Sequence, residues 1–158
     1  MFKVFIDGSA GTTGLRIRGM LEKREDVQLI ALPEAQRKDP AARKDALNRA
    51  DVVFLCLPDD AAREAVALVE NPDTIVIDAS TAHRTSPGWA YGFPELSEQH
   101  RAAVAHGRRI ANPGCYASGF IALVYPLVKA GIVSSDYPFV CHAVSGYSGA
   151  GKKGIAEY

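Results

Sequence analysis

Short apolar runs alternate with segments of helical character over the first two thirds of the chain. The runs are rich in Val, Ile, Leu and Phe, and those at 51–58 and 74–80 are apolar on both faces, as parallel strands covered by helices require. Predicted strands cover residues 2–6, 27–32, 51–58, 74–80 and 108–112, and predicted helices cover 15–23, 59–70 and 97–106. The stretch 33–46 is polar and basic and is assigned to neither class.

This alternation predicts an α/β fold with a Rossmann-like, doubly wound parallel sheet and right-handed crossovers. In such sheets, ligands bind at the carboxyl ends of the strands. The unusual residues of this chain follow the predicted strands: GSAGTTG at 8–14, Leu57 and Pro58, the segment 80–84, and NPGC at 112–115. We therefore expect four loops to form one ligand-binding edge, followed by an apolar helix over 115–131 and a strand over 138–144.

The glycine-rich turn after the first strand has GxxGxxG spacing, which departs from the commoner GxGxxG pattern of dinucleotide-binding proteins. Gly8 would allow a tight turn, Gly11 a close approach to a pyrophosphate, and Gly14 close packing of the helix. Helix N–H groups and the two threonine hydroxyls would hold phosphate oxygens. The predicted pyrophosphate site comprises Gly8, Ser9, Ala10, Gly11, Thr12, Thr13 and Gly14. An ordinary connection between a strand and a helix is the alternative.

Charged residues follow the second predicted strand. An acid there would favour the ribose of NAD, whereas basic residues would meet the 2′-phosphate of NADP. The chain offers Glu34 and then Arg37 and Lys38. We interpret the two basic residues as favouring NADP, with a solvated charged loop as the alternative.

The three cysteines occupy different contexts. Cys56 and Cys141 lie inside predicted strands, which favours a core role for both. Cys115 follows an Asn-Pro-Gly turn at the start of a predicted helix, where unsatisfied N–H groups and the helix dipole favour a thiolate. Beside a nicotinamide, such a thiolate suggests attack on an acyl carbon followed by hydride exchange that yields an aldehyde. A small, well-packed apolar residue is the alternative.

Composition narrows the class of protein. The 158 residues suffice for one domain and part of another, and 18 basic residues balance 18 acidic ones, which argues against nucleic acid or anionic membranes as partners. No apolar run approaches the roughly 20 residues of a membrane span, and the first residues alternate like a strand rather than a signal peptide. The odd cysteine count, without paired spacing, argues against disulfides and a metal site. We expect a cytoplasmic protein with a small-molecule substrate.

Five segments, at these intervals, resemble the N-acetyl-gamma-glutamyl-phosphate reductase family, of the shorter type. They are GSAGTTG (8–14), DASTAHR (78–84), YGFPEL (91–96), ANPGCYA (111–117) and SGYSGAGKK (145–153). Gly114 and Tyr116 on either side of Cys115 favour this family over the aspartate-semialdehyde dehydrogenases, which share the fold but have Asn-Cys at the nucleophile. The resemblance implies reduction of N-acetyl-L-glutamyl 5-phosphate by NADPH to the 5-semialdehyde, with release of phosphate, in arginine biosynthesis.

The pattern and the resemblance together assign roles to individual residues. Cys115 is the expected catalytic nucleophile, which holds the acyl group as a thioester. Cofactor binding is assigned to residues 8–14, Arg37, Lys38, Leu57, Pro58, Ser80, Ser148, Gly149 and Gly151, and substrate binding to Arg84, Asn112 and Ser145. A loop salt bridge is the alternative for Arg84, and a plain flexible turn for the segment 145–153.

The match also has a gap. The family uses a histidine as acid–base partner of the cysteine, in the second half of its chain, and none of His83, His100, His106 and His142 occupies that position. We expect residues 1–112 to form an NADP-binding domain and 113–158 to begin a second, catalytic α/β domain that is truncated here. The chain should then bind cofactor without normal turnover, and the full-length form should be a homo-oligomer. An aspartate-semialdehyde dehydrogenase-like enzyme, a non-catalytic NADP-binding module and a thiol hydrolase remain alternatives.

Overall fold

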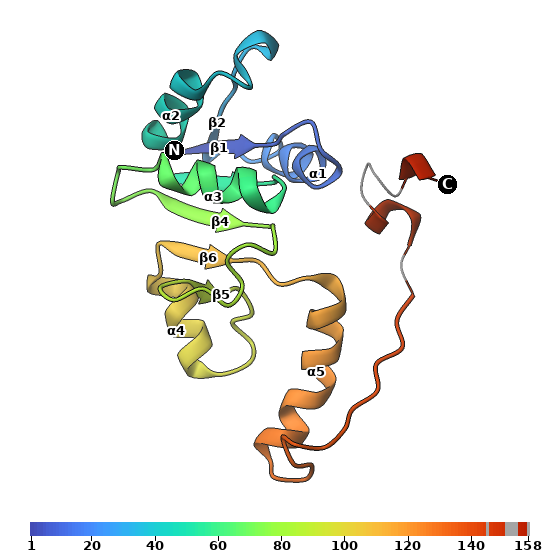
Figure 1. The fold of residues 1–158 in the computed structure, drawn as a ribbon. Helices are drawn as coiled ribbons and strands as arrows, with labels where there is room; N and C mark the ends of the chain where they lie inside the picture. Colours follow the sequence, from blue (N-terminus) through green and yellow to red (C-terminus); the bar gives the residue numbers. More distant parts are fainter. Residues whose placement is uncertain (145, 151–154, 158) are drawn as a thin grey trace.

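A fully parallel sheet of six strands runs through the first 111 residues of the computed structural model, which describes residues 1–144, 146–150 and 155–157 (Figure 1). Its strands are β1 (Phe2–Asp7), β2 (Val27–Ile30), β3 (Val52–Leu55), β4 (Ile75–Asp78), β5 (Ala90–Tyr91) and β6 (Arg109–Ala111), in the order β2-β1-β3-β4-β6-β5. The chain forms β2 on one side of β1 and then crosses back to form β3 on the other. This reversal is the topological switch point at which such sheets bind ligands. The predicted α/β class is confirmed.

Five α-helices and two short 3₁₀ helices accompany the sheet within the described residues up to 150. They are α1 (Thr12–Leu21), α2 (Pro40–Arg49), α3 (Asp59–Ala67), α4 (Glu98–His106) and α5 (Cys115–Lys129), with η1 (Glu34–Gln36) and η2 (Tyr147–Ala150). Helix α2 lies in the polar stretch that the sequence pattern left unassigned. The Asp39 side chain caps it, accepting from the N–H groups of Ala41 and Ala42 at 2.7 and 3.1 Å, and Pro40 occupies its first turn.

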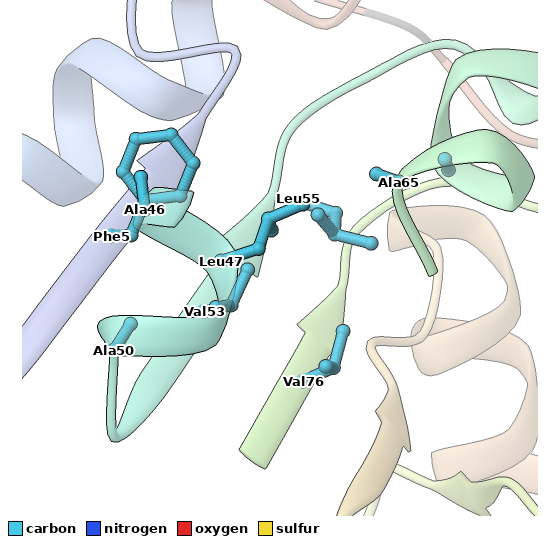
Figure 2. Packing of buried hydrophobic residues seen from close by; sticks show 9 residues of the cluster. Phe5, Ala46, Leu47, Ala50, Val53, Leu55, Ala65 and Val76 are labelled. Carbon is cyan, nitrogen blue, oxygen red and sulfur yellow. The ribbon is translucent and has the colours of Figure 1, made fainter. Parts of the chain in front are cut away.

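The main core lies between the sheet and helices α2 and α3 (Figure 2). Large apolar side chains of the strands meet the alanines of the helices and Leu47 of α2, and the alanines let the helices approach the sheet closely. Its buried members are Phe5, Ala46, Leu47, Ala50, Val53, Leu55, Ala62, Ala65 and Val76. This packing holds β1, β3 and β4 in register and so positions the loops that follow them.

Three predictions about the strands were wrong. Residues 138–144 form no strand, and Val140 and Val144 are 81% and 97% exposed, because no described strand pairs with this segment and an unpaired strand leaves its backbone groups unsatisfied. Cys141, expected in the core, is therefore exposed, and Cys56 lies just past the end of β3 and is only half-buried. The sequence pattern also missed β5, a two-residue strand that pairs with β6.

Helix α5 leaves the sheet after β6 and extends away from it (Figure 1). None of its residues is buried and Leu123 is 75% exposed, so its apolar face is only partly covered by described residues, among them Phe139 against Phe120 and His100 against Tyr125. No described helix is both long and apolar enough to cross a membrane.

Candidate active site

Four consecutive strands, β1, β3, β4 and β6, end at one edge of the sheet and are followed by the loops that carry the predicted site residues (Figure 1). All six strands are parallel, so their carboxyl ends share that edge. The glycine turn, Leu57 with Pro58, the segment 79–84 and the residues before α5 are thus neighbouring loops. The prediction of one common edge is confirmed.

The turn after β1 is packed too tightly for any side chain at two of its glycines. Gly8 has a φ of +87°, and a Cβ there would lie 2.2 Å from the carbonyl oxygen of Cys56. A Cβ at Gly14 would lie 2.4 Å from the Gly8 oxygen, so α1 packs directly on the turn. Gly11 is the N-cap of α1, which has no side-chain cap, so the turn presents backbone N–H groups in the way that phosphate-binding turns do.

A cavity of about 830 Å³ opens beside this turn. Its walls come from Gly8, Ser9 and Ala10, from residues 29–32 at the end of β2, and from Leu57. The volume falls within the range of small-molecule and cofactor sites. The predicted cofactor residues Arg37 and Lys38 line it, whereas Gly11, Thr12, Thr13, Gly14, Pro58 and Ser80 do not.

The cations of this cavity differ in how they are paired. Arg43 is buried and donates from Nε and Nη2 to Oδ2 of Asp7, at 3.1 and 2.9 Å. Burial raises the pKa of Asp7, although Arg43 opposes the effect. Arg37 is 4.0 Å from an exposed carboxylate of Glu34, and the described residues form no ion pair with Lys38. Sequence reasoning missed the Asp7–Arg43 pair; a charged residue closing an apolar strand was the available signal.

The loop after β4 is built around a buried carboxylate. Asp78 is fully buried and accepts hydrogen bonds from the Ser80 N–H at 2.9 Å, the Ser80 hydroxyl at 2.7 Å and Nδ1 of His83 at 2.6 Å. The His83 ring stacks on Trp89, with centroids 4.1 Å apart. Ser80, predicted to lie beside the cofactor, thus has its hydroxyl engaged by Asp78. Asp78, His83 and Trp89 were not predicted as site residues.

Arg84 and Asn112, both predicted to bind substrate, meet at the start of α5. Nε of Arg84 donates to the Asn112 carbonyl oxygen at 3.1 Å, and Nη2 donates to the Ala79 carbonyl oxygen at 3.3 Å. A Cβ at Gly114 would lie 2.7 Å from Nη1 of Arg84, so the guanidinium rests against the N-cap of α5. No described carboxylate lies within ion-pairing distance of Arg84, so the salt bridge considered for it is absent from the described part of the chain.

Cys115 is exposed and is the first residue of the 15-residue helix α5, whose N-cap, Gly114, provides no side-chain cap. Cys56 differs: burial, together with the charges of Asp78 and Asp7, raises the pKa of its thiol to about 11. Cys141 is exposed but lies outside any helix or strand. Of the three cysteines, Cys115 is therefore the one that is exposed, begins a helix and lies at the sheet edge that carries the glycine turn.

The structure describes only some of the predicted site residues near the end of the chain. Ser145 and Gly151 lie outside the described residues, and the Ser148 side chain is also not described. Gly149 lies in η2, where its N–H donates to the Gly146 oxygen at 2.9 Å.

Known proteins match the whole described site region. Curated relatives include N-acetyl-gamma-glutamyl-phosphate reductase 2 of Pseudomonas putida, 59% identical over 98% of this chain, and reductases of the same name from Burkholderia cenocepacia, at 57% over 98%, and Chelativorans sp., at 54% over 99%. The chain spans about half the length of each, 50%. The resemblance inferred from the five sequence segments is confirmed.

Solved structures with the same fold include the aspartate semialdehyde dehydrogenase of Francisella tularensis, with a TM-score of 0.70 at 18% identity over 99% of this chain and 48% of that one. Aspartate semialdehyde dehydrogenase II of Vibrio cholerae gives 0.68 at 19% identity over 99% of this chain and 50% of its own. Two family models match, the semialdehyde dehydrogenase NAD binding domain at residues 3–104 and the semialdehyde dehydrogenase dimerisation domain at 115–158. Since the first of these alone covers most of the chain, including the glycine turn and its cavity, the chain belongs to the semialdehyde dehydrogenase family through its NAD-binding domain.

Proposed function

We propose that this chain provides the cofactor-binding domain and the nucleophile of an N-acetyl-gamma-glutamyl-phosphate reductase in arginine biosynthesis. The reaction is reduction of N-acetyl-L-glutamyl 5-phosphate by NADPH to N-acetyl-L-glutamate 5-semialdehyde, with release of phosphate. The observation that carries the proposal is the exposed Cys115 at the start of α5, on the sheet edge that bears the glycine turn, with Arg84 against the same helix start. The names of the curated relatives support the choice of N-acetyl-L-glutamyl 5-phosphate as the substrate.

In the first step the Cys115 sulfur, as the thiolate, attacks the acyl carbon of the acyl phosphate. The C–S bond forms and the bond between carbon and the phosphate oxygen breaks, so that phosphate leaves with the electron pair. Negative charge near the first turn of α5 is favoured by its free N–H groups. Arg84 is suited to bind the phosphate, because a guanidinium pairs well with phosphate oxygens and this one forms no ion pair with a described carboxylate; it interacts with the charge of Asp59 without direct contact.

The glycine turn and the adjoining cavity fit a dinucleotide, because two side-chain-free positions bring the backbone close and the cavity has the volume of a cofactor site. Bound there, NADPH would supply the hydride that converts the Cys115 thioester into the aldehyde. The turn 8–14 and Leu57 would hold the cofactor, with Pro58 and Ser80 on the adjoining loops. Arg37 and Lys38 would meet a 2′-phosphate, since Arg43 in the same cavity is already paired with Asp7.

We further propose that residues 1–112 form the cofactor domain and 113–158 begin the catalytic domain, with Ser145, Ser148, Gly149 and Gly151 on its substrate side. The separate matches at 3–104 and 115–158 support this division. The dimerisation-domain match and the incompletely covered apolar face of α5 support a homo-oligomer in the full-length form.

The proposal is tested by mixing the chain with N-acetyl-L-glutamyl 5-phosphate and following phosphate release and intact mass. We expect one equivalent of phosphate per chain and one acyl group on Cys115, with neither in Cys115→Ser. Cys141→Ser, which removes the other exposed thiol, is the matched control and should behave as the parent. Phosphate release that survives Cys115→Ser would contradict the proposal, and a preference for aspartyl phosphate would favour the aspartate-semialdehyde dehydrogenase alternative.

Cofactor binding is measured separately, by the fluorescence of NADPH and NADH on titration with the chain. Replacing Arg37 and Lys38 by Gln should weaken NADPH binding and leave NADH binding unchanged. An equal loss of affinity for both cofactors would contradict the assignment of Arg37 and Lys38 to the 2′-phosphate. If the parent chain changed the fluorescence of neither cofactor, the thiol hydrolase would be favoured.

A further inference from the structure

Asp78 and His83 form a buried pair, and His83 directly precedes Arg84 in the chain. A buried carboxylate is costly unless its oxygens are hydrogen-bonded, and Asp78 meets this need from the loop that follows it. His83 supplies the contact that is most distant in sequence, five residues on, and therefore closes the loop back onto the end of β4. The imidazole therefore fixes the far end of the loop, next to Arg84.

Two further contacts hold the same loop. The His83 ring is stacked nearly parallel on Trp89, at an interplanar angle of 12°, which fixes the ring plane. On the other side of the loop, the Thr81 N–H and hydroxyl both donate to the carboxylate of Asp59 at the start of α3, and the Thr81 hydroxyl lowers the pKa of Asp59. Residues 80–83 are therefore fixed at both ends, and Arg84 follows immediately.

Among the described residues, the hydrogen bonds of the Arg84 guanidinium go to main-chain carbonyl oxygens, those of Asn112 and Ala79, and the carboxylate of Asp59 interacts with its charge from farther away. The first of these comes from the strand-to-helix connection that leads to Cys115, and the guanidinium touches the N-cap glycine, Gly114. Carbonyl oxygens orient the guanidinium without neutralising its charge. A guanidinium whose hydrogen bonds go to uncharged carbonyl groups is thereby kept against Gly114, the residue before Cys115, by a loop whose anchor, Asp78, is buried.

We propose that the Asp78–His83 pair is a positioning device: it holds the loop so that the Arg84 guanidinium stays on the start of α5, and it thereby sets the reactivity of Cys115 toward anionic partners. The proposal rests on the proposed function in taking Cys115 as the reacting thiol and a phosphorylated acyl group as its partner. Asp78 and His83 touch neither, so both are positioning residues. A purely structural role would affect folding but would not discriminate between charged and neutral reaction partners.

The test uses the rates at which iodoacetate and iodoacetamide alkylate Cys115 in the Cys141→Ser chain at low ionic strength. These reagents alkylate the same sulfur but differ in charge, so the ratio of their rates reports the local positive charge. Cys56 does not interfere near neutral pH, because its thiol has a pKa of about 11. Arg84→Gln should lower the ratio by about fivefold, the effect expected for one charge close to the thiol and partly screened by water.

His83→Phe keeps a ring against Trp89 but loses the donor to Asp78, and it should lower the ratio nearly as far as Arg84→Gln does. His83→Asn, whose amide nitrogen occupies the place of Nδ1, should restore most of the ratio. Adding His83→Phe to Arg84→Gln should lower it no further, because the effect acts through the guanidinium. His106→Phe, at the exposed end of α4, is the matched control and should leave the ratio unchanged.

An unchanged ratio in His83→Phe, with the fold intact by circular dichroism, would overturn the proposal, and so would an additive loss in the double variant. Should His83→Phe fail to fold, Thr81→Ala decides by the same ratio, since it removes one of the two hydrogen bonds that hold the loop to Asp59 and leaves the contacts of Asp78 in place. Alkylation needs neither cofactor nor substrate. A chain that responds as expected here but forms no thioester would therefore refute the proposed function and leave the positioning role standing.

Discussion

The buried ion pair under the cofactor cavity makes a sharp prediction for the variant Arg43→Met. The side chains of Arg43 and Asp7 are 10% and 7% exposed, and two guanidinium nitrogens contact one carboxylate oxygen at 2.9 and 3.1 Å. Two unit charges about 4 Å apart attract by about 4 kcal/mol at an effective dielectric constant of about 20. Removing one partner leaves the other buried and unpaired, so Arg43→Met should lower the free energy of unfolding at pH 7 by about 3–5 kcal/mol.

The sign of the pH dependence follows from Asp7. Burial already raises the pKa of this carboxyl in the native protein, and without Arg43 the pKa should rise further. Between the unfolded pKa of 3.8 and the native pKa, the folded state binds more protons, so stability falls as the pH rises through that window. Arg43→Met should therefore regain stability as the solution is acidified from neutral pH toward the unfolded pKa, relative to the parent chain.

Urea unfolding followed by the fluorescence of Trp89, the single tryptophan, measures this effect at several pH values. Trp89 packs against the main core and so reports its unfolding. The double variant Asp7→Asn with Arg43→Met removes both charges and should recover most of the loss at neutral pH. A loss below about 1 kcal/mol in Arg43→Met, or the same pH slope as the parent, would refute the reasoning.

Three other predictions follow from the loops at the ligand-binding edge. Gly8→Ala should cost about 3 kcal/mol and abolish NADPH binding, measured by urea unfolding and fluorescence titration, because the new Cβ meets the Cys56 oxygen and the positive φ is strained. Gly114→Ala, at an ordinary negative φ, should preserve the helix content seen by circular dichroism but push Arg84 away, and so lower the iodoacetate rate at Cys115 more than the iodoacetamide rate. At pH 8, mass spectrometry should find Cys56 modified about a hundredfold more slowly in the folded chain than in urea, because a pKa of about 11 in place of 9.0 leaves little thiolate.

Local signals predicted the elements that local interactions stabilise. The apolar runs became β1, β3 and β4, and the segment after the Asn-Pro-Gly turn became α5, beginning at Cys115 as expected. The helix within the stretch 33–46 was not predicted, because it is stabilised by contacts outside its own apolar pattern. Helix α2 has a weak apolar face, with Arg43 among its three buried residues, and is stabilised by the Asp39 cap and by contact with the sheet. Propensity alone does not reveal such a helix.

Long-range partners decided what the local pattern could not. Residues 138–144 have the composition of a strand, yet a strand forms only where a neighbour supplies hydrogen bonds, and none is present among the described residues. The contact of Arg84 with Gly114 was equally hidden, because it joins the loop after β4 to the start of α5. Only the pairing of β4 with β6 brings those two loops together.

The sequence by itself determined the alternation of strands and helices, the glycine turn and the place of Cys115 at a helix start, because each follows from side-chain periodicity and backbone freedom over a few residues. The tertiary structure decided which polar side chains are buried together, namely Asp7 with Arg43 and Asp78 with His83, and it placed Arg84 against the helix start that carries Cys115. Strand order sets those neighbours, and strand order results from packing across the whole sheet, which no local pattern encodes.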